Sequence, residues 1–197
     1  MERTQLSSSP PRKPRADAAR NRARILAVAR TLLAEHGSEV QLPEVARAAG
    51  VGVGTVYRHF PTQRDLVEAA AELRFAEIEE FARTRCLRAE PGHALAGYLH
   101  HVGEVLAADR GLSESIEGTR QSASSEPRGE TRVQLETVVG ELIERDRGAG
   151  TLRDDCTVAD VYMIVGSISA TIRSEAGDWR RLLEIVLDGL RPPTGAR

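Results

Sequence analysis

The chain has 197 residues, of which 41% are apolar and only 4% are aromatic, so aliphatic side chains must build its core, a composition that favours helices over sheets. The formal net charge of -2 conceals a division, because residues 1–64 carry 11 Lys and Arg against 5 Asp and Glu, whereas residues 65–197 carry 16 against 24. A basic front and an acidic remainder indicate a module that faces nucleic acid, joined to one that does not.

The two cysteines, Cys86 and Cys156, lie too far apart in sequence to suggest a metal site or a disulfide framework. No apolar run reaches membrane-spanning length, and the polar, Pro-rich N-terminus does not resemble a signal peptide. We therefore expect a protein of the reducing cytoplasm that makes no contact with a membrane.

Residues 1–16 contain Ser, Pro and basic residues with almost nothing to bury, which predicts a disordered basic arm. Such an arm can lie in a DNA minor groove, or it can be a solvated tail without a role. From about Asp17 to His36 the apolar residues recur at helical spacing, and Gly37 follows where a left-handed C-terminal cap belongs.

Residues 42–60, LPEVARAAGVGVGTVYRHF, predict two short helices joined by a tight turn. Pro43 suits the first turn of a helix, and Gly50 can adopt the positive φ that turns the chain. A third helix is expected over Val53 to His59. With the helix before it, this layout is that of a helix-turn-helix, whose second helix enters the DNA major groove.

The remaining chain predicts further helices separated by Gly and Pro breaks. No segment shows strand alternation, so we expect an all-α protein of about nine helices, with a DNA-binding domain over 17–64 and a ligand-binding and dimerisation domain over 65–197. The later helices are expected from Gln63 into 83–88, over 94–108, over 109–118 as a short irregular one, and over 130–147, 158–172 and 179–190, with a loop at 121–129.

Other kinds of site find little support. The glycines of residues 50–54 do not form a phosphate loop, because no strand precedes them and no suitable Lys follows. His100 and His101 point to different helix faces, so we expect no metal site there. Residues 67–197 contain no nucleophile–base pair and no nucleotide loop, so we expect no enzyme activity and no cofactor.

Three strings carry a family resemblance: VARAAGV at 45–51, GTVYRHF at 54–60, and Asp65-Leu66. Together they resemble the DNA-binding domain of the TetR-family transcriptional regulators. The sequence departs from that pattern at Leu42 and Gly52, where helix-capping hydroxyl residues are frequent. It also departs at Gln63, where the family often has a Lys that contacts phosphate, and Arg64 is the expected substitute.

The resemblance implies that Tyr57 and His59 donate to DNA phosphates. Arg58 is long enough to reach a phosphate or a guanine edge. Val53 and the methyl of Thr55 can contact thymine methyl groups, and Gly54 permits close backbone approach. The expected DNA-binding residues are Gln41, Arg47, Val53, Gly54, Thr55, Tyr57, Arg58, His59 and Arg64.

A single recognition helix reads few base pairs, so we expect a homodimer that places two such helices in successive major grooves. Two apolar stripes near the C-terminus are the candidate dimer interface, although part of each stripe must be intramolecular core. They comprise Val161, Ile164, Val165 and Ile168 on one helix, and Leu182, Leu183, Val186 and Leu190 on the next.

The expected function is a repressor that a small-molecule effector releases from a palindromic double-stranded DNA operator. The effector is expected among the middle helices, near Tyr98, His101, Arg120 and Met163. The alternative is a regulator that responds to a protein partner, which a solid core with an exposed apolar patch would favour over an enclosed cavity.

Overall fold

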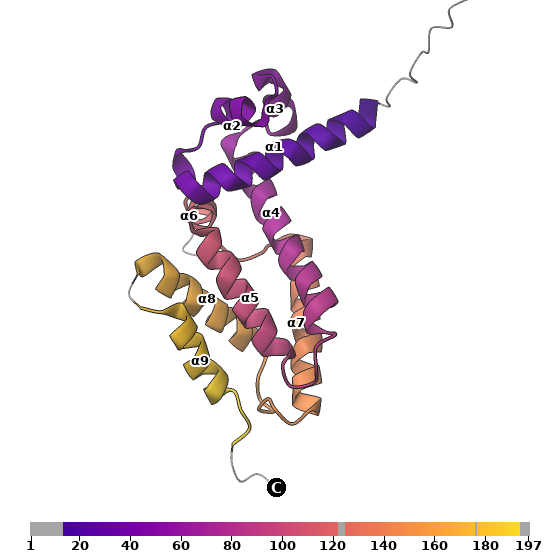
Figure 1. Ribbon diagram of the computed structural model, residues 1–197, viewed down its shortest axis with the longest axis vertical. Helices are drawn as coiled ribbons and strands as arrows, with labels where there is room; N and C mark the ends of the chain where they lie inside the picture. Colours follow the sequence, from indigo (N-terminus) through magenta and orange to yellow (C-terminus); the bar gives the residue numbers. More distant parts are fainter. Residues whose placement is uncertain (1–13, 122–124, 176, 194–197) are drawn as a thin grey trace, which may run out of the picture.

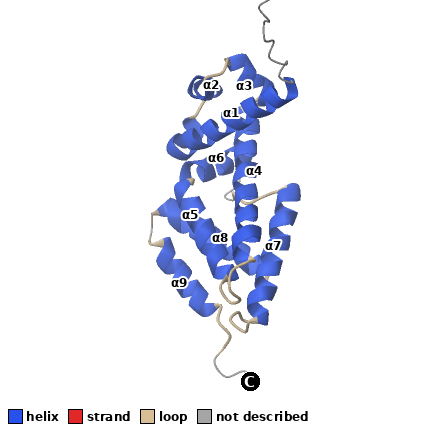
Figure 2. Ribbon diagram, turned by 45° about the vertical axis from the view of Figure 1, so that its right-hand side comes forward, coloured by secondary structure: helices blue, strands red, loops and turns tan. Residues whose placement is uncertain are grey.

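The computed structural model describes residues 14–121, 125–175 and 177–193, and within these ranges it contains nine α-helices and no strand (Figures 1 and 2). The prediction of an all-α fold is therefore confirmed. No helix in these ranges is both long and apolar enough to cross a membrane. The helices are α1 (Pro14–His36), α2 (Leu42–Ala49), α3 (Val53–His59), α4 (Gln63–Phe81), α5 (Ala94–Ala108), α6 (Arg110–Arg120), α7 (Gly129–Gly148), α8 (Val158–Ser174) and α9 (Trp179–Gly189), with a 3-10 turn η1 (Gly37–Glu39) and a π-helical turn η2 (Ala82–Cys86).

Helices α3 and α5 have the predicted bounds, and the ends of α7, α8 and α9 differ from the predictions by one or two residues. The larger differences are in α1 and α6. Residues 14–16, assigned from sequence to the disordered arm, form the start of α1, where Pro14 is acceptable because the first helical residue needs no N–H partner. The rest of that arm, residues 1–13, lies outside the described residues, as does the 122–124 part of the expected loop. Helix α6 is regular rather than irregular, because burial of Leu112 and Ile116 outweighs the weak helix propensity of its Gly and Ser residues.

The first three helices form a small head at one end of the molecule (Figure 1). Helices α1, α2 and α3 pack together, burying Ile25, Leu33, Val45 and Val56 completely. Gly50 ends α2 with φ of 63°, in the left-handed region that favours glycine, and so turns the chain into α3. The short helices are thereby held at a fixed angle on the side of the head.

Helix α4 runs from the head into a larger body that contains α5 and α7–α9 (Figures 1 and 2). It begins with a capping box, in which the Thr62 side chain accepts from the Asp65 N–H and the Asp65 carboxylate accepts from the Thr62 N–H. Helix α6 lies where the two parts meet, packed against α1 and η1 on one side and against α4 on the other. Helices α4 and α6 therefore connect the head to the body.

Candidate DNA-binding surface and interior cavity

Helix α3 separates its residues into a buried face and an outward face. Val56 is completely buried and Phe60, just past the helix end, is 1% exposed, so together they fix the helix to the head. On the other face Val53 is 42% exposed and Tyr57 is 46% exposed. Exposed large apolar side chains on a seven-residue helix leave a surface that a DNA groove can cover.

Arg58 folds back over the outward face of α3. Its Nε donates to the carbonyl oxygen of Gly54 at 3.1 Å, and its Nη2 donates to Oγ1 of Thr55 at 3.1 Å. An arginine held in this way leaves N–H groups free for a base edge or a phosphate. Arg58, expected at a phosphate or a guanine edge, is thus hydrogen-bonded to Thr55, which is expected to contact bases.

Gln63 is tied to the head rather than turned to solvent. Its Nε2 donates to the carbonyl oxygen of Val40 at 2.6 Å, while its Oε1 is buried without a hydrogen-bond partner in the described part of the chain. The structure therefore gives this departure from the family pattern a packing role. Arg64 next to it is exposed and available for a phosphate.

The other expected DNA contacts, Gln41 and Arg47, are exposed, and His59 is half-buried. Sequence reasoning missed Arg22, whose guanidinium lies 5.3 Å from the centre of the Phe60 ring. Arg22 and His59 line one shallow depression beside α3. The sequence does place Arg22 in a basic stretch of α1. Only the packing of α1 against α3, however, brings it to this surface.

The body contains a cavity of about 110 Å³. Its walls come from α4, α5, α7 and α8 and from residues 125–127, and most of the side chains are apolar. Two phenols, Tyr98 and Tyr162, also line it, and burial raises the pKa of both, to about 12 for Tyr162. The phenols stay neutral at physiological pH and can donate hydrogen bonds.

Arg74 of α4 lines the cavity and is completely buried. Its Nη1 donates to Oγ of Ser113 on α6 at 2.8 Å, and its Nη2 makes a long contact of 3.4 Å to the carbonyl oxygen of Ser125. Burial lowers the pKa of Arg74 to about 10, with Asp109 and Glu117 acting in the opposite direction. The guanidinium therefore remains charged at neutral pH.

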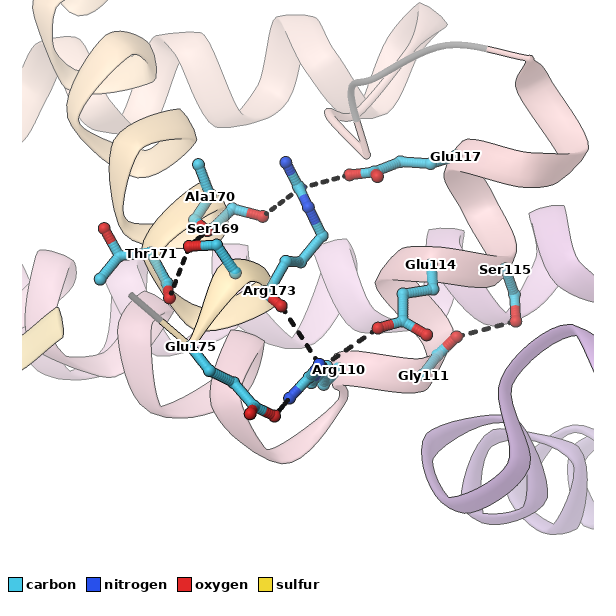
Figure 3. Close-up of polar contacts among 11 residues, drawn as sticks. Arg110, Gly111, Glu114, Ser115, Glu117, Ser169, Ala170, Thr171, Arg173 and Glu175 are labelled. Atoms are coloured by element: carbon cyan, nitrogen blue, oxygen red, sulfur yellow. Dashed lines mark hydrogen bonds and ion pairs between the residues drawn. The ribbon is translucent and has the colours of Figure 1, made fainter. Parts of the chain in front are cut away.

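Polar contacts join α6 to α8 beside the cavity (Figure 3). Nη1 of Arg173 donates to Glu117 Oε1 at 2.6 Å and to Ser169 Oγ at 3.0 Å, and both Arg173 and Ser169 line the cavity. Arg110, at the start of α6, pairs with Glu175 and donates to the carbonyl oxygen of Arg173 at 3.1 Å. Helix α6 is thus bonded to the end of α8 at two points.

Of the four expected effector-binding residues, one lines this cavity. Tyr98 does, whereas Arg120 forms a two-point ion pair with Glu68 at 2.6 and 2.9 Å and ties α6 to α4. His101 stacks on Phe81 in a separate surface depression, with ring centres 3.6 Å apart. Met163 is 66% exposed on the outer face of α8.

Two family models match this chain and together cover most of it. Residues 25–70 match the model of the bacterial regulatory proteins of the tetR family. Residues 90–192 match the model of the C-terminal domain of SbtR-like transcriptional regulators. The chain belongs to the TetR family of transcriptional regulators.

Solved structures of TetR regulators support the assignment over nearly the full length. The chain is 39% identical to the TetR transcription regulatory protein from Mycobacterium vanbaalenii, with a TM-score of 0.67 over 91% of this chain and 99% of that one. It is 30% identical to a TetR transcriptional regulator from Streptomyces coelicolor, with a TM-score of 0.67 over 88% and 99%.

A third relative matches over a shorter range. An HTH-type transcriptional regulator of Staphylococcus aureus is 38% identical over 76 residues, which are 35% of this chain and 39% of that protein. The chain thus matches less than half the length of this relative.

In this TetR-family chain the two apolar stripes expected at a dimer interface contain both buried and half-buried residues. Val161, Ile164, Ile168 and Leu183 are at most 7% exposed, so they belong to the core of the chain itself. Val165, Leu182, Val186 and Leu190 are half-buried. The most exposed apolar side chains of α8 and α9 are Met163 and Ile185, at 66% and 55%.

Neither thiol lies at an exposed site. Cys86 and Cys156 are both buried, and burial raises the pKa of Cys86 to about 11. A protonated, buried thiol reacts slowly with oxidants. In the described ranges no three His, Cys, Asp or Glu side chains come together as a metal site.

Proposed function

We propose that this TetR-family regulator is a homodimeric repressor that binds a palindromic operator through α3, and that a small molecule entering the interior cavity releases it. The observation that carries the proposal is the combination of an outward-facing α3 with a partly enclosed cavity between α4, α5, α7 and α8. A cavity of this kind favours a small-molecule effector over a protein partner.

The DNA-binding half of the proposal is supported by exposure and charge. Val53 and Tyr57 are 42% and 46% exposed on a helix whose opposite side is anchored by Val56. Arg47, Arg58 and Arg64 are exposed around them. Cations near a protruding helix supply phosphate contacts, while the helix itself reads base edges.

We assign the dimer contact to the outer faces of α8 and α9. Met163 and Ile185 expose apolar surface there, and Gly166 and Ala170 on α8 are small and exposed, which permits close helix approach. A second copy packed on this face would bury these side chains and leave both heads free at the far end.

The coupling would run through α6. The cavity residue Arg74 bonds to Ser113 of α6, and Arg173 bonds to Glu117 of α6. Between the body and the head, Arg30 of α1 pairs with Asp109 at 2.7 Å, directly before α6. An effector that moves α4 or α6 would therefore change the position of α1, and release follows if it binds the displaced state more tightly.

The test is selection of bound sequences from a random pool of duplex DNA, using the full-length protein. We expect enrichment of an inverted repeat whose half-sites are centred about 10 base pairs, or roughly one helical turn, apart. Tyr57→Ala should weaken binding to every sequence by a similar factor, whereas Thr137→Ala, at an exposed position on α7 of the body, should leave binding unchanged. Recovery of direct repeats, or of no sequence, would contradict the proposal.

The second arm measures the dimer by light scattering. The wild-type chain should have twice the mass of one subunit, and Met163→Glu combined with Ile185→Glu should shift it toward the monomer, because two unpaired carboxylates would be buried. A monomeric wild-type protein would refute the interface.

A further inference from the structure

We propose that the effector is a small carboxylic acid whose carboxylate binds the guanidinium of Arg74 and whose apolar part fills the cavity. The inference rests on the proposed function only in taking this cavity as the effector site. It concerns the chemical class of the molecule, which the family assignment leaves open.

The first observation is that Arg74 has no anionic partner. A guanidinium carries five N–H groups, and here one donates to the hydroxyl of Ser113 and one makes the long contact to the carbonyl of Ser125. Its Nε is buried and has no hydrogen-bond partner among the residues that the structure describes. No carboxylate of the described residues lies within ion-pair distance of Arg74, and an unpaired buried charge is costly.

The second observation is that the surrounding arginines are all paired. Arg120 pairs with Glu68 at 2.6 Å, Arg173 with Glu117 at 2.6 Å, and Arg30 with Asp109 at 2.7 Å. Arg74 is therefore the one arginine of this group that has no carboxylate bound to it. Arg30 also pairs with Glu77, so the group as a whole carries no net charge, and the case for an anion depends on the direct partners of Arg74. A singly charged carboxylate adds less negative charge to this group than a doubly charged phosphate would.

The ring of Phe75 stabilises the charge of Arg74 without providing an anionic partner. The guanidinium lies 5.0 Å from the centre of the Phe75 ring, a cation–π contact. Glu126 also lines the cavity, and its carboxylate lies 3.5 Å from Arg132. The long contact to Ser125 is the weakest bond of Arg74 and the one that an anion would replace.

The geometry of the free N–H groups suits a carboxylate. Nε and one N–H of a terminal nitrogen lie side by side on a guanidinium and can bind both oxygens of a carboxylate at once. In Arg74 this edge includes the unpartnered Nε. The phenol of Tyr98, which lines the same cavity, provides a further donor.

The volume limits the apolar part. A cavity of about 150 Å³ lined by apolar groups holds benzene, so the smaller volume of 110 Å³ here limits the apolar part to at most one ring or a short aliphatic chain. Ile78, Val102 and Leu106 are among the apolar side chains that would surround it. Phenyl and C6 acids are therefore the appropriate probes.

The experiment titrates the full-length protein by calorimetry with three acids and their neutral primary amides. The pairs are benzoate with benzamide, phenylacetate with phenylacetamide, and hexanoate with hexanamide. In at least one pair we expect the acid to bind ~10–100-fold more tightly than the amide, the range for hydrogen bonds to a charged group.

Three variants locate the effect. Arg74→Met should abolish the preference for the acid, and Arg74→Lys should retain part of it. Arg153→Met removes a surface arginine paired with Asp155, which does not line the cavity, and should change nothing. Thermal unfolding of each variant establishes that it is folded, and the comparison of acid with amide in the wild-type protein needs no variant.

Equal binding of acid and amide in every pair, an absence of binding by all three acids, or an acid preference that survives Arg74→Met would overturn the inference. Release of DNA selected from the random pool is measured separately. Acids that bind through Arg74 without releasing DNA would uphold the ligand class and contradict the proposed function. A neutral compound that releases DNA equally well from the wild-type protein and from Arg74→Met would uphold the proposed function and contradict the ligand class.

Discussion

A methyl group added at Gly111 should separate α6 from α1. A Cβ atom there would lie 2.3 Å from the carbonyl oxygen of Leu33 and 2.7 Å from that of Ala34, and backbone atoms cannot yield as a flexible side chain can. Gly118 provides a matched control in the same helix, because a Cβ at that position has no neighbour within 4 Å.

Both substitutions to Ala gain the same helix propensity, about 0.5–1 kcal/mol, so the difference between them isolates the clash. Overpacking of a close contact costs about 1–3 kcal/mol. For a chain of this length each kcal/mol shifts the melting temperature by about 2–4 °C, so Gly111→Ala should melt roughly 2–12 °C below Gly118→Ala.

The assay is thermal unfolding of both variants at one protein concentration, since an oligomer's stability depends on concentration. DNA binding is then measured below both transitions. Because α6, together with α4, holds α1 against the body, Gly111→Ala should also weaken affinity for the selected DNA. A Gly111→Ala protein as stable as Gly118→Ala would refute the close approach of α6 to α1 and the coupling route built on it.

Three further expectations concern the head and the body. Thr55→Ala should change the preferred half-site sequence while leaving the salt dependence of binding unchanged, as selection from a random pool would reveal. Arg64→Ala should reduce the slope of log affinity against log salt concentration by about one per subunit. Gln63→Ala should leave that slope unchanged and lower the free energy of unfolding by about 1 kcal/mol, because the hydrogen bond to Val40 is lost. A changed slope in the Gln63 variant would argue against its packing role. Asp146→Asn should cost about 1–3 kcal/mol in denaturant unfolding, because the buried carboxylate accepts three backbone N–H bonds at the start of α5 and an amide can present only one acceptor oxygen.

The sequence alone determined the fold class and the position of α3, the expected recognition helix. Helical spacing, the left-handed glycines and the VARAAGV and GTVYRHF strings act over a few residues, so they could be read without knowing the packing. The predicted bounds of α3 and α5 agree with the structure for this reason. Arg74 could also have been noticed, because it interrupts an apolar stripe of α4 formed by Val67, Ala70, Phe75 and Ile78.

Only the tertiary structure decided which residues surround the cavity and which side of each C-terminal helix faces inward. Tyr98, His101 and Met163 all lie on helices whose sequences are compatible with an interior position, yet only Tyr98 lines the cavity. Periodicity identifies the apolar face of a helix but does not specify the partner against which it packs. That choice depends on contacts between segments distant in the chain, such as Arg74 with Ser113, and these exist only once the helices have assembled.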